Sequence, residues 1–328
     1  MELFDSLKFK IVRRGIKIAF PEATDSRILG AAARLKAEEL ITPVLIGNKD
    51  EVAKAATARG ITIDQFEILD PNDYADWDKM VEAFVERRKG KATKEQAEEI
   101  LKDVNYFGTM LTYMGVTDGM VSGAIHSTGD TVRPALQIIK TKPGVSRTSG
   151  AFLMVRGRDQ EKYLFSDCAI NVNPSSQELA EIAVASAETA ELFDIDPKVA
   201  LLSFSTKGSA KAPEVDKVVE ATKIAKEMAP DIILDGELQF DAAYVSAVGQ
   251  LKAPDSTVAG KATVFVFPEL QSGNIGYKIA QRFGNFEAIG PILQGLNKPV
   301  SDLSRGANEE DVYKLSIITA AQTLNTTK

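Results

Sequence analysis

The sequence predicts an α/β protein made of two doubly wound, three-layer α/β/α domains with mainly parallel sheets. Three observations lead to this prediction. Short apolar runs rich in β-branched and aromatic residues alternate with amphipathic helical stretches along most of the chain. These runs are apolar throughout, which is typical of strands that helices cover on both faces. The 328 residues are also long for one hydrophobic core, so two domains are expected.

The elements follow from these patterns in chain order. Strands are predicted at Gly15–Phe20, Pro43–Ile46, Gly119–Ser122, Val199–Ser205, Ile232–Leu234 and Thr263–Phe267. A strand pair joined by a polar turn is predicted at Ala151–Val155 and Tyr163–Ser166. Helical periodicity predicts helices at Ser26–Glu39, Trp77–Arg88, Ser175–Leu192, Pro213–Met228, Asn274–Arg282 and about Glu309–Leu324.

Two polar breaks suggest where the domains divide. The first is the turn-rich stretch Thr141–Ser149, and the second lies near Asn297–Pro299. If the final helix packs on the first domain, the second domain is an insertion. We therefore expect residues 1–148 plus 297–328 to form a discontinuous first domain and residues 149–296 to form the second.

Composition narrows the class of protein. The net charge of -7 argues against broad binding of nucleic acid or of an anionic membrane, although it allows a local basic pocket for a small anion. The first residues lack the apolar run of a secretory signal, and no stretch is apolar enough to span a membrane. One cysteine and one histidine exclude an internal disulfide and a Cys/His zinc site. We expect a soluble, cytoplasmic protein without a metal.

The segment 118–140 places hydroxyls between a strand and a helix. Ser127 and Thr128 precede the helix, Thr131 lies at its start, and Arg133 adds a planar cation. Free amides, small residues and a helix N-terminus suit phosphate, which an arginine can bind through two hydrogen bonds. The alternative is an ordinary βα loop with a capped helix. Neither G-x-x-x-x-G-K-[ST] nor G-x-G-x-x-G is present, so this is not a standard nucleotide loop.

For three other candidate functional residues or segments, a structural role is the preferred interpretation. His126 has no G-x-S-x-G partner motif, so we interpret it as a supporting imidazole rather than as part of a hydrolase triad. Cys168 follows an apolar strand and an acid, both of which disfavour the thiolate, so we expect it to be inert. The acids of segment 235–241 are compatible with a hard cation, but helix capping by Asp241 is the preferred interpretation.

The C-terminal stretch SRGANEEDV, residues 304–312, combines a hydroxyl, a guanidinium and three carboxylates. Gly306 is expected to permit a sharp turn, and acids suit the first turn of a helix. This structural account covers Glu309, Glu310 and in part Asp311, but it leaves Ser304-Arg305 unexplained. The pattern alone leaves a functional role for that dipeptide open.

Several long segments resemble the phosphate acetyltransferase (phosphotransacetylase) family, within the phosphate acetyl/butyryl transferases. They are GAIHSTGDTVRPALQIIKT, DGELQFDAA, GNIGYKIAQR and DLSRGANEEDVY, and the similarity runs in order through essentially the whole chain. The resemblance implies reversible acetyl transfer between acetyl phosphate and coenzyme A, with no metal, no tightly bound cofactor and no covalent acyl-enzyme. It also implies a homodimer of two-domain subunits with the active site in an interdomain cleft.

The resemblance also implies residue roles. Asp311 matches the base that takes the thiol proton, Ser304 a hydroxyl near the sulfur, and Arg305 the cation that faces the acyl carbonyl. Arg133 and Arg27 match basic positions that hold phosphate or coenzyme A, together with hydroxyls of Ser127, Thr128 and Thr131. The family's E-x-R-K pattern points to Arg88, with Arg87 as a competitor. Ala307 stands where members of the family often have cysteine, so a thiol is not essential there.

Three rival interpretations remain from the sequence. A phosphate butyryltransferase has the same chemistry with a larger acyl pocket. A nicotinamide-dependent dehydrogenase has similar architecture, although the glycine fingerprint is missing. A non-catalytic acyl-CoA-sensing domain is disfavoured because Ser304, Arg305 and Asp311 are all present.

Overall fold

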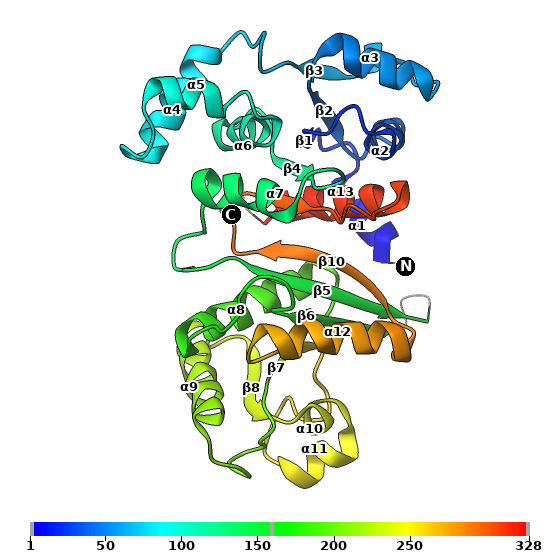
Figure 1. Cartoon of the computed structure of the whole chain (residues 1–328). Helices are drawn as coiled ribbons and strands as arrows, with labels where there is room; N and C mark the ends of the chain where they lie inside the picture. Colours follow the sequence, from blue (N-terminus) through cyan, green and yellow to red (C-terminus); the bar gives the residue numbers. More distant parts are fainter. Residues whose placement is uncertain (1–2, 158–160, 326–328) are drawn as a thin grey trace. The chain divides into compact units, whose positions relative to one another are not determined.

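The computed structural model describes residues 3–157 and 161–325. Within them the chain forms two compact units, coloured along the sequence in Figure 1. Unit 1 contains residues 3–142 and the C-terminal part from Leu296 onward, and unit 2 contains Pro143–Gly295. The last part of the sequence therefore folds with the first part.

Unit 1 has a five-stranded parallel sheet in the order β11-β4-β1-β2-β3. Its strands are β1 (Lys17–Phe20), β2 (Thr42–Ile46), β3 (Glu67–Leu69), β4 (Gly119–Ser122) and β11 (Val300–Asp302). Its helices are α1 (Leu3–Ile11), α2 (Ser26–Ala37), α3 (Lys49–Ala58), η1 (Ile63–Gln65), α4 (Trp77–Arg88), α5 (Lys94–Ile100), α6 (Val104–Met114), α7 (Thr128–Pro134), the π-helical η2 (Ala135–Ile139) and α13 (Glu309–Thr323).

Helices cover both faces of this sheet. All four residues of β4 are buried although successive side chains point to opposite faces, so neither face is open at its centre. Helix α6 packs against β1 and β4, and α13 packs against β4, β11 and α2. The predicted three-layer arrangement is confirmed for this unit. Strand β1 starts at Lys17, later than predicted, because Gly15 turns the chain with φ +67°.

The order of the strands brings two distant loops to one edge. Strand β11 lies beside β4 in parallel, with Asp302 opposite Ser122. The loop from β4 to α7 and the loop from β11 to α13 therefore leave the sheet at the same carboxyl edge. In open α/β sheets, ligands bind outside this edge.

Unit 2 has a six-stranded mixed sheet in the order β10-β5-β6-β9-β7-β8. Its strands are β5 (Ser149–Arg156), β6 (Glu161–Ser166), β7 (Lys198–Leu202), β8 (Ile233–Leu238), β9 (Val264–Val266) and β10 (Glu287–Gln294). Strands β10, β5 and β6 pair antiparallel, whereas β6, β9, β7 and β8 are parallel. The predicted pair of strands is confirmed as β5 and β6, while β10, which Gly290-Pro291 interrupts, was not predicted.

The helices of unit 2 also cover its sheet on both faces. They are α8 (Ser176–Leu192), α9 (Pro213–Met228), α10 (Phe240–Tyr244), α11 (Ser246–Lys252) and α12 (Leu270–Gly284). Helix α8 packs against β6, β7, β9 and β10, and α12 packs against β5, β6 and β10. Helix α12 begins at Leu270, four residues before the predicted start, because the carboxylate of Glu269 accepts hydrogen bonds from the amides of Gln271 and Ser272.

Strand β8 continues beyond the predicted Leu234 through polar residues. Its acids are acceptable in the sheet because each has a partner: Asp235 forms ion pairs with Lys207 and Lys226, and Glu237 accepts from the hydroxyl of Ser205. No helix among residues 3–157 and 161–325 is long and apolar enough to cross a membrane.

Candidate functional site

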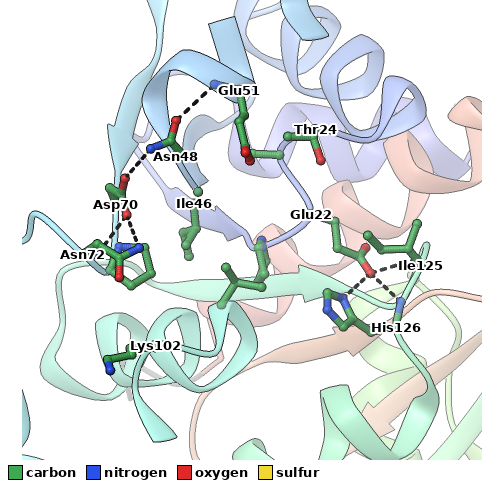
Figure 2. A pocket seen from close by; sticks show the side chains of 15 residues that line it. Glu22, Thr24, Ile46, Asn48, Glu51, Asp70, Asn72, Lys102, Ile125 and His126 are labelled. Atoms are coloured by element: carbon green, nitrogen blue, oxygen red, sulfur yellow. Dashed lines mark hydrogen bonds and ion pairs between the residues drawn. The ribbon is translucent and has the colours of Figure 1, made fainter. Parts of the chain in front are cut away.

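The loop after β4 is held in place by hydrogen bonds to a buried carboxylate, that of Glu22. Glu22, just beyond β1, accepts hydrogen bonds from the amides of Ala124, Ile125 and His126 at 2.8, 2.9 and 2.9 Å. Its Oε1 also lies 2.8 Å from Nδ1 of His126, as Figure 2 shows. The loop was predicted to offer free amides to phosphate, but these three amides are not free because Glu22 already accepts from them.

The Glu22–His126 pair is electrostatically coupled. The hydrogen bond that the ring donates to Glu22 raises the pKa of His126, although burial of the ring opposes the change. Burial also disfavours ionisation of Glu22, but the hydrogen bonds from His126, Ile125 and Ala124 outweigh it and lower the pKa of this carboxyl. The predicted supporting role for His126 fits this geometry. Sequence reasoning missed Glu22, whose signal is its position just past a strand at the carboxyl edge.

Helix α7 begins with a capping box. The hydroxyl of Ser127 accepts from the amide of Asp130 at 3.3 Å and also contacts its carboxylate at 2.6 Å. Thr128 is exposed, but Thr131 has 0% relative exposure. A direct contact of Thr131 with substrate, predicted above, is therefore incompatible with this conformation. Its hydroxyl faces Asp302, also buried, at the end of β11.

Asp302 lies below the junction of the two loops. Its Oδ1 and the hydroxyl of Thr131 are buried and have no hydrogen-bond partner among the described residues. Burial raises the pKa of Asp302, the nearby hydroxyls of Thr128 and Thr131 oppose the rise, and the charge of Glu22 adds to it. Gly123 makes room for this carboxylate, because an added Cβ would lie 2.5 Å from Oδ1.

The charges of two of the predicted arginines act on Tyr106. The charges of Arg133 and Arg88 both act to lower the pKa of Tyr106, although burial dominates and raises it. Neither guanidinium makes a hydrogen bond or ion pair within the part of the chain that the structure describes. By contrast, Arg87 donates to the carbonyls of Ile138 and Ile139 at 2.6 and 3.1 Å. The structure thus separates Arg87, which holds the end of η2, from Arg88, which is available.

The loop that carries Ser304 and Arg305 is exposed at its tip. The hydroxyl of Ser304 accepts from the amide of Gly306 at 3.2 Å, and its carbonyl accepts from Ala307 at 2.9 Å. The side chain of Arg305 makes no hydrogen bond or ion pair with residues 3–157 or 161–325. The predicted turn at Gly306 is present, closed by the bond from the Ala307 amide to the Ser304 carbonyl, but it does not depend on a glycine. The φ of Gly306 is not left-handed, and an added Cβ would meet only the Ser304 hydroxyl at 3.7 Å.

The acids at the start of α13 have separate partners. Glu309 pairs with Arg59 at 2.5 Å, and Glu310 pairs with Arg34 at 2.6 Å, which confirms their structural interpretation. Asp311 forms a capping box with Asn308, in which each side chain accepts from the other residue's amide at 2.9 Å. Asp311 remains exposed, so its carboxylate caps the helix and is also accessible from outside.

Arg27 links the two loops. Its guanidinium donates to the carbonyl of Ala124 at 2.8 Å and to the carbonyls of Arg305 and Ala307 at 3.0 and 2.7 Å. The carboxylate of Asp25 accepts from it twice, at 3.0 and 2.8 Å. Arg27, predicted to bind substrate, thus directs its donors to the protein itself.

A cavity of about 530 Å³ opens beside this region (Figure 2). It lies at the carboxyl ends of β1, β2 and β3 and is lined in part by Glu22, His126, Glu51, Asp70 and Lys102. None of the nine predicted site residues lines it. Glu51 and Asp70 make it unfavourable for a phosphate, so the arginines outside it are the better candidates for anion binding.

The remaining sequence candidates are structural. Cys168 is buried, and burial followed by the charge of Asp167 raises its pKa well above the ordinary value, so the thiolate is disfavoured as predicted. Asp241 does not cap a helix as predicted: Gln239 occupies the N-cap of α10, and Asp241 pairs with Lys252 at 2.8 Å. The described residues contain no group of three or more His, Cys, Asp or Glu side chains arranged to hold a metal.

Fold and site together define a two-unit α/β protein in which two loops at the carboxyl edge of a parallel sheet, and the helices that follow them, carry arginines, hydroxyls and exposed carboxylates. The sequence profile of the phosphate acetyl/butaryl transferase family matches residues 3–320, and the chain belongs to this family of acyltransferases. It is 60% identical over 323 residues to a phosphate acetyltransferase of Bacillus subtilis, an alignment that covers 98% of this chain and 99% of the relative.

Solved structures agree with this assignment. A phosphotransacetylase from Streptococcus pyogenes superposes with a TM-score of 0.97 at 66% identity, covering 98% of each chain. A phosphotransacetylase from Staphylococcus aureus gives a TM-score of 0.94 at 57% identity, also covering 98% of each chain. The resemblance noted in the sequence is confirmed at the level of family and fold.

Proposed function

We propose that this protein transfers an acetyl group reversibly between acetyl phosphate and coenzyme A, with both substrates bound together and the thiolate attacking the acetyl carbonyl directly. The observation that carries the proposal is the set of three arginines, Arg133, Arg88 and Arg305, whose guanidinium groups have no hydrogen-bond or ion-pair partner among the described residues. Unpaired cations beside hydroxyls suit two phosphate-bearing substrates.

In this proposal the β4–α7 region binds the anionic parts of the substrates. Arg133 and Arg88 neutralise phosphate groups that would otherwise repel each other, and Arg88 takes this role rather than Arg87. Thr128 adds a hydroxyl donor at the start of α7, whereas Ser127, predicted to bind substrate as well, already donates its single O–H to the carboxylate of Asp130. Thr131 is buried beside Asp302 and does not touch substrate in this proposal. Holding both substrates in one site makes the encounter effectively unimolecular, which is worth up to about 7–11 kcal/mol.

The β11–α13 loop supplies the groups at the reacting centre. Arg305 faces the acyl carbonyl and stabilises the oxyanion that develops during attack, an effect typically worth about 2.7–4 kcal/mol per donor. Ser304 places a hydroxyl near the sulfur; its oxygen accepts from the Gly306 amide, which leaves its O–H to donate. Phosphate is a good leaving group, so little acid assistance is needed.

Asp311 takes the thiol proton in this scheme. An ordinary carboxyl has a pKa of about 3.9 and a thiol one of about 8.5, so the transfer is uphill by about 6 kcal/mol before the site acts. Neighbouring cations lower this cost by stabilising the thiolate. We therefore assign much of the activation of sulfur to the arginines and the final proton acceptance to Asp311.

The proposal includes coenzyme A and acetyl-CoA as substrates, with no tightly bound cofactor and no metal. It places the reaction in the cytoplasm, where coenzyme A thioesters are made and used. It also includes a homodimer, which is supported by α12. Ile275, Ile279 and Phe283 lie at i, i+4 and i+8 on this helix with 56%, 52% and 87% exposure. An apolar stripe of this kind suits a second copy in an isologous contact.

One assay tests the function. Phosphate-dependent cleavage of acetyl-CoA is measured by thiol release, with butyryl-CoA in parallel and with phosphate omitted as the control. We expect thiol release from acetyl-CoA that depends on phosphate. Faster release from butyryl-CoA would favour the butyryltransferase alternative. Absence of release from both, with binding of acetyl-CoA retained, would favour a sensing domain and remove the proposal.

A further inference from the structure

The segment 22–27, between β1 and α2, contacts both loops of the candidate site. At one end, Glu22 holds the amides of residues 124–126. At the other end, Arg27 holds the carbonyl of Ala124 and, across almost the whole sequence, the carbonyls of Arg305 and Ala307. The β4–α7 loop and the β11–α13 loop are therefore joined through one side chain.

The hydrogen-bond capacity of Arg27 is fully used. A guanidinium has five N–H donors and no acceptor. Nε and Nη2 each donate to the Asp25 carboxylate, Nη2 also donates to Ala124, and Nη1 donates to Arg305 and Ala307. A substrate phosphate would have to displace one of these partners. By contrast, no hydrogen bond or ion pair within residues 3–157 and 161–325 involves the guanidinium groups of Arg133, Arg88 and Arg305.

We propose that Arg27 is a positioning residue that fixes the Ser304–Arg305 loop against the β4–α7 loop, and that it does not bind substrate. This inference rests on the proposed function. Apart from Arg27, the loop is held by two turn bonds, from the amides of Gly306 and Ala307 to Ser304, and by one long-range bond, from the Leu303 amide to the Ser122 carbonyl at 2.7 Å. None of these fixes the carbonyl of Arg305 itself.

Asp25 makes this anchor specific for arginine. It is the N-cap of α2, and it accepts from both the amide and the guanidinium of Arg27, which sets the direction of the side chain. The fork then reaches three carbonyls from two loops. A lysine retains the charge, but its three donors radiate from one nitrogen and do not match a planar fork. Charge alone therefore does not replace Arg27.

The test compares Arg27→Lys and Arg27→Gln with the wild-type enzyme, and with Arg13→Lys as the matched control. Arg13 is an exposed arginine of the same unit, paired with Glu39 and outside the site. We expect both Arg27 variants to lose about 100-fold in kcat while the KM values for coenzyme A and acetyl phosphate change by less than about threefold. The control is expected to retain wild-type kinetics.

If Arg27 binds substrate, the substitutions are expected to affect KM rather than kcat. In that case KM for one substrate rises by about tenfold or more with kcat nearly unchanged, and the cation-retaining Lys variant is much less affected than the Gln variant. This outcome would overturn the proposal. A role in overall stability alone would lower the Tm without changing kcat, and would overturn it as well.

Amide hydrogen exchange supplies a readout that does not require activity. We expect faster exchange at Ala307 and at the amides of residues 124–126 in the Arg27 variants, with unchanged exchange in the sheet of unit 2. If the wild-type protein releases no thiol, the proposed function fails, while exchange still tests the anchor. Unchanged exchange at both loops would overturn the anchor even in an active enzyme.

Discussion

At the scale of single residues, the Glu22–His126 pair explains how the β4–α7 loop keeps its shape. A fully buried carboxylate is unfavourable unless its oxygens are satisfied. Here three consecutive amides and one imidazole nitrogen satisfy it. The hydrogen bond that Glu22 accepts from the ring also raises the pKa of His126.

This pair predicts how the stability of the folded protein changes with pH. The folded-state pKa of His126 lies above the unfolded value of 6.5. Its contribution to stability is therefore fully present below pH 6.5 and is lost as the pH rises through the folded-state pKa. Since the chain has one histidine, its ring signal in NMR reports the titration without ambiguity. We expect a midpoint above 6.5 in the folded protein and near 6.5 in urea.

The variant Glu22→Gln provides the matched comparison. It keeps the size of the side chain but removes the charge that raises the pKa of His126. We expect the midpoint of the histidine to fall toward the unfolded value in this variant. An unchanged midpoint would mean that Glu22 does not control the ring, and would contradict the geometry of the pair.

Asp311 caps helix α13 and is also the proposed catalytic base. A substitution that keeps the cap but removes the base can separate these two roles. Asp311→Asn keeps an oxygen that can accept from the Asn308 amide, so the start of α13 is expected to persist. The variant loses the carboxylate base, and we expect kcat to fall by at least about tenfold. The measurement is steady-state turnover together with the Tm.

The control for this variant is Glu178→Gln, which changes the same N3 position of a capping box in unit 2. It is expected to keep wild-type turnover. A loss of less than about tenfold in Asp311→Asn, with the Tm preserved, would remove Asp311 as the base.

At the scale of elements, α12 has two different faces. One packs on the sheet: Tyr277 stacks on Phe152 with ring centroids 4.0 Å apart, and Gly276 allows close approach to Phe267. The other face carries the stripe Ile275, Ile279 and Phe283. Helices of soluble proteins rarely leave such a face uncovered, so we expect a second copy of the chain to cover it.

This expectation is tested with Phe283→Lys, which places a charge on the most exposed position of the stripe. The wild type is expected to behave as a dimer in size-exclusion chromatography with light scattering, and the variant as a monomer or a weakened dimer. Phe9→Lys is the matched control, because Phe9 is 77% exposed on α1 of unit 1. A Phe283→Lys variant that stays fully dimeric would place the interface elsewhere.

The elements also show where sequence patterns succeed. Helices α4 and α9 have the predicted bounds, because an amphipathic period and clear end signals coincide there. Strand β11 and helix α6 were missed. Strand β11 has only three residues, too few to show an alternating pattern. Helix α6 begins after the N-cap Asp103 and ends at Gly115, so its end signals are present in the sequence and were overlooked.

At the scale of the whole molecule, the proposed reaction requires both substrates to be bound at once. Double-reciprocal plots of initial rate against coenzyme A, at several fixed concentrations of acetyl phosphate, are therefore expected to intersect. Parallel lines would indicate a covalent acyl-enzyme and contradict direct attack. The control is mass spectrometry of the protein after incubation with acetyl phosphate alone, in which no acetylated form is expected.

The sequence by itself determined the α/β class, the bounds of α4 and α9 and the family, because these depend on local periodicity and on long motifs read in order. Tertiary structure decided which groups of those motifs are free to act. Glu22 occupies the amides of the β4–α7 loop, Arg87 is held by η2 while Arg88 is not, and Thr131 is buried. Such outcomes depend on partners that are up to 280 residues apart, as for Arg27 and Ala307. Whether a donor or acceptor group already has a partner depends on residues that only the folded chain brings close, so no local pattern in the sequence specifies it.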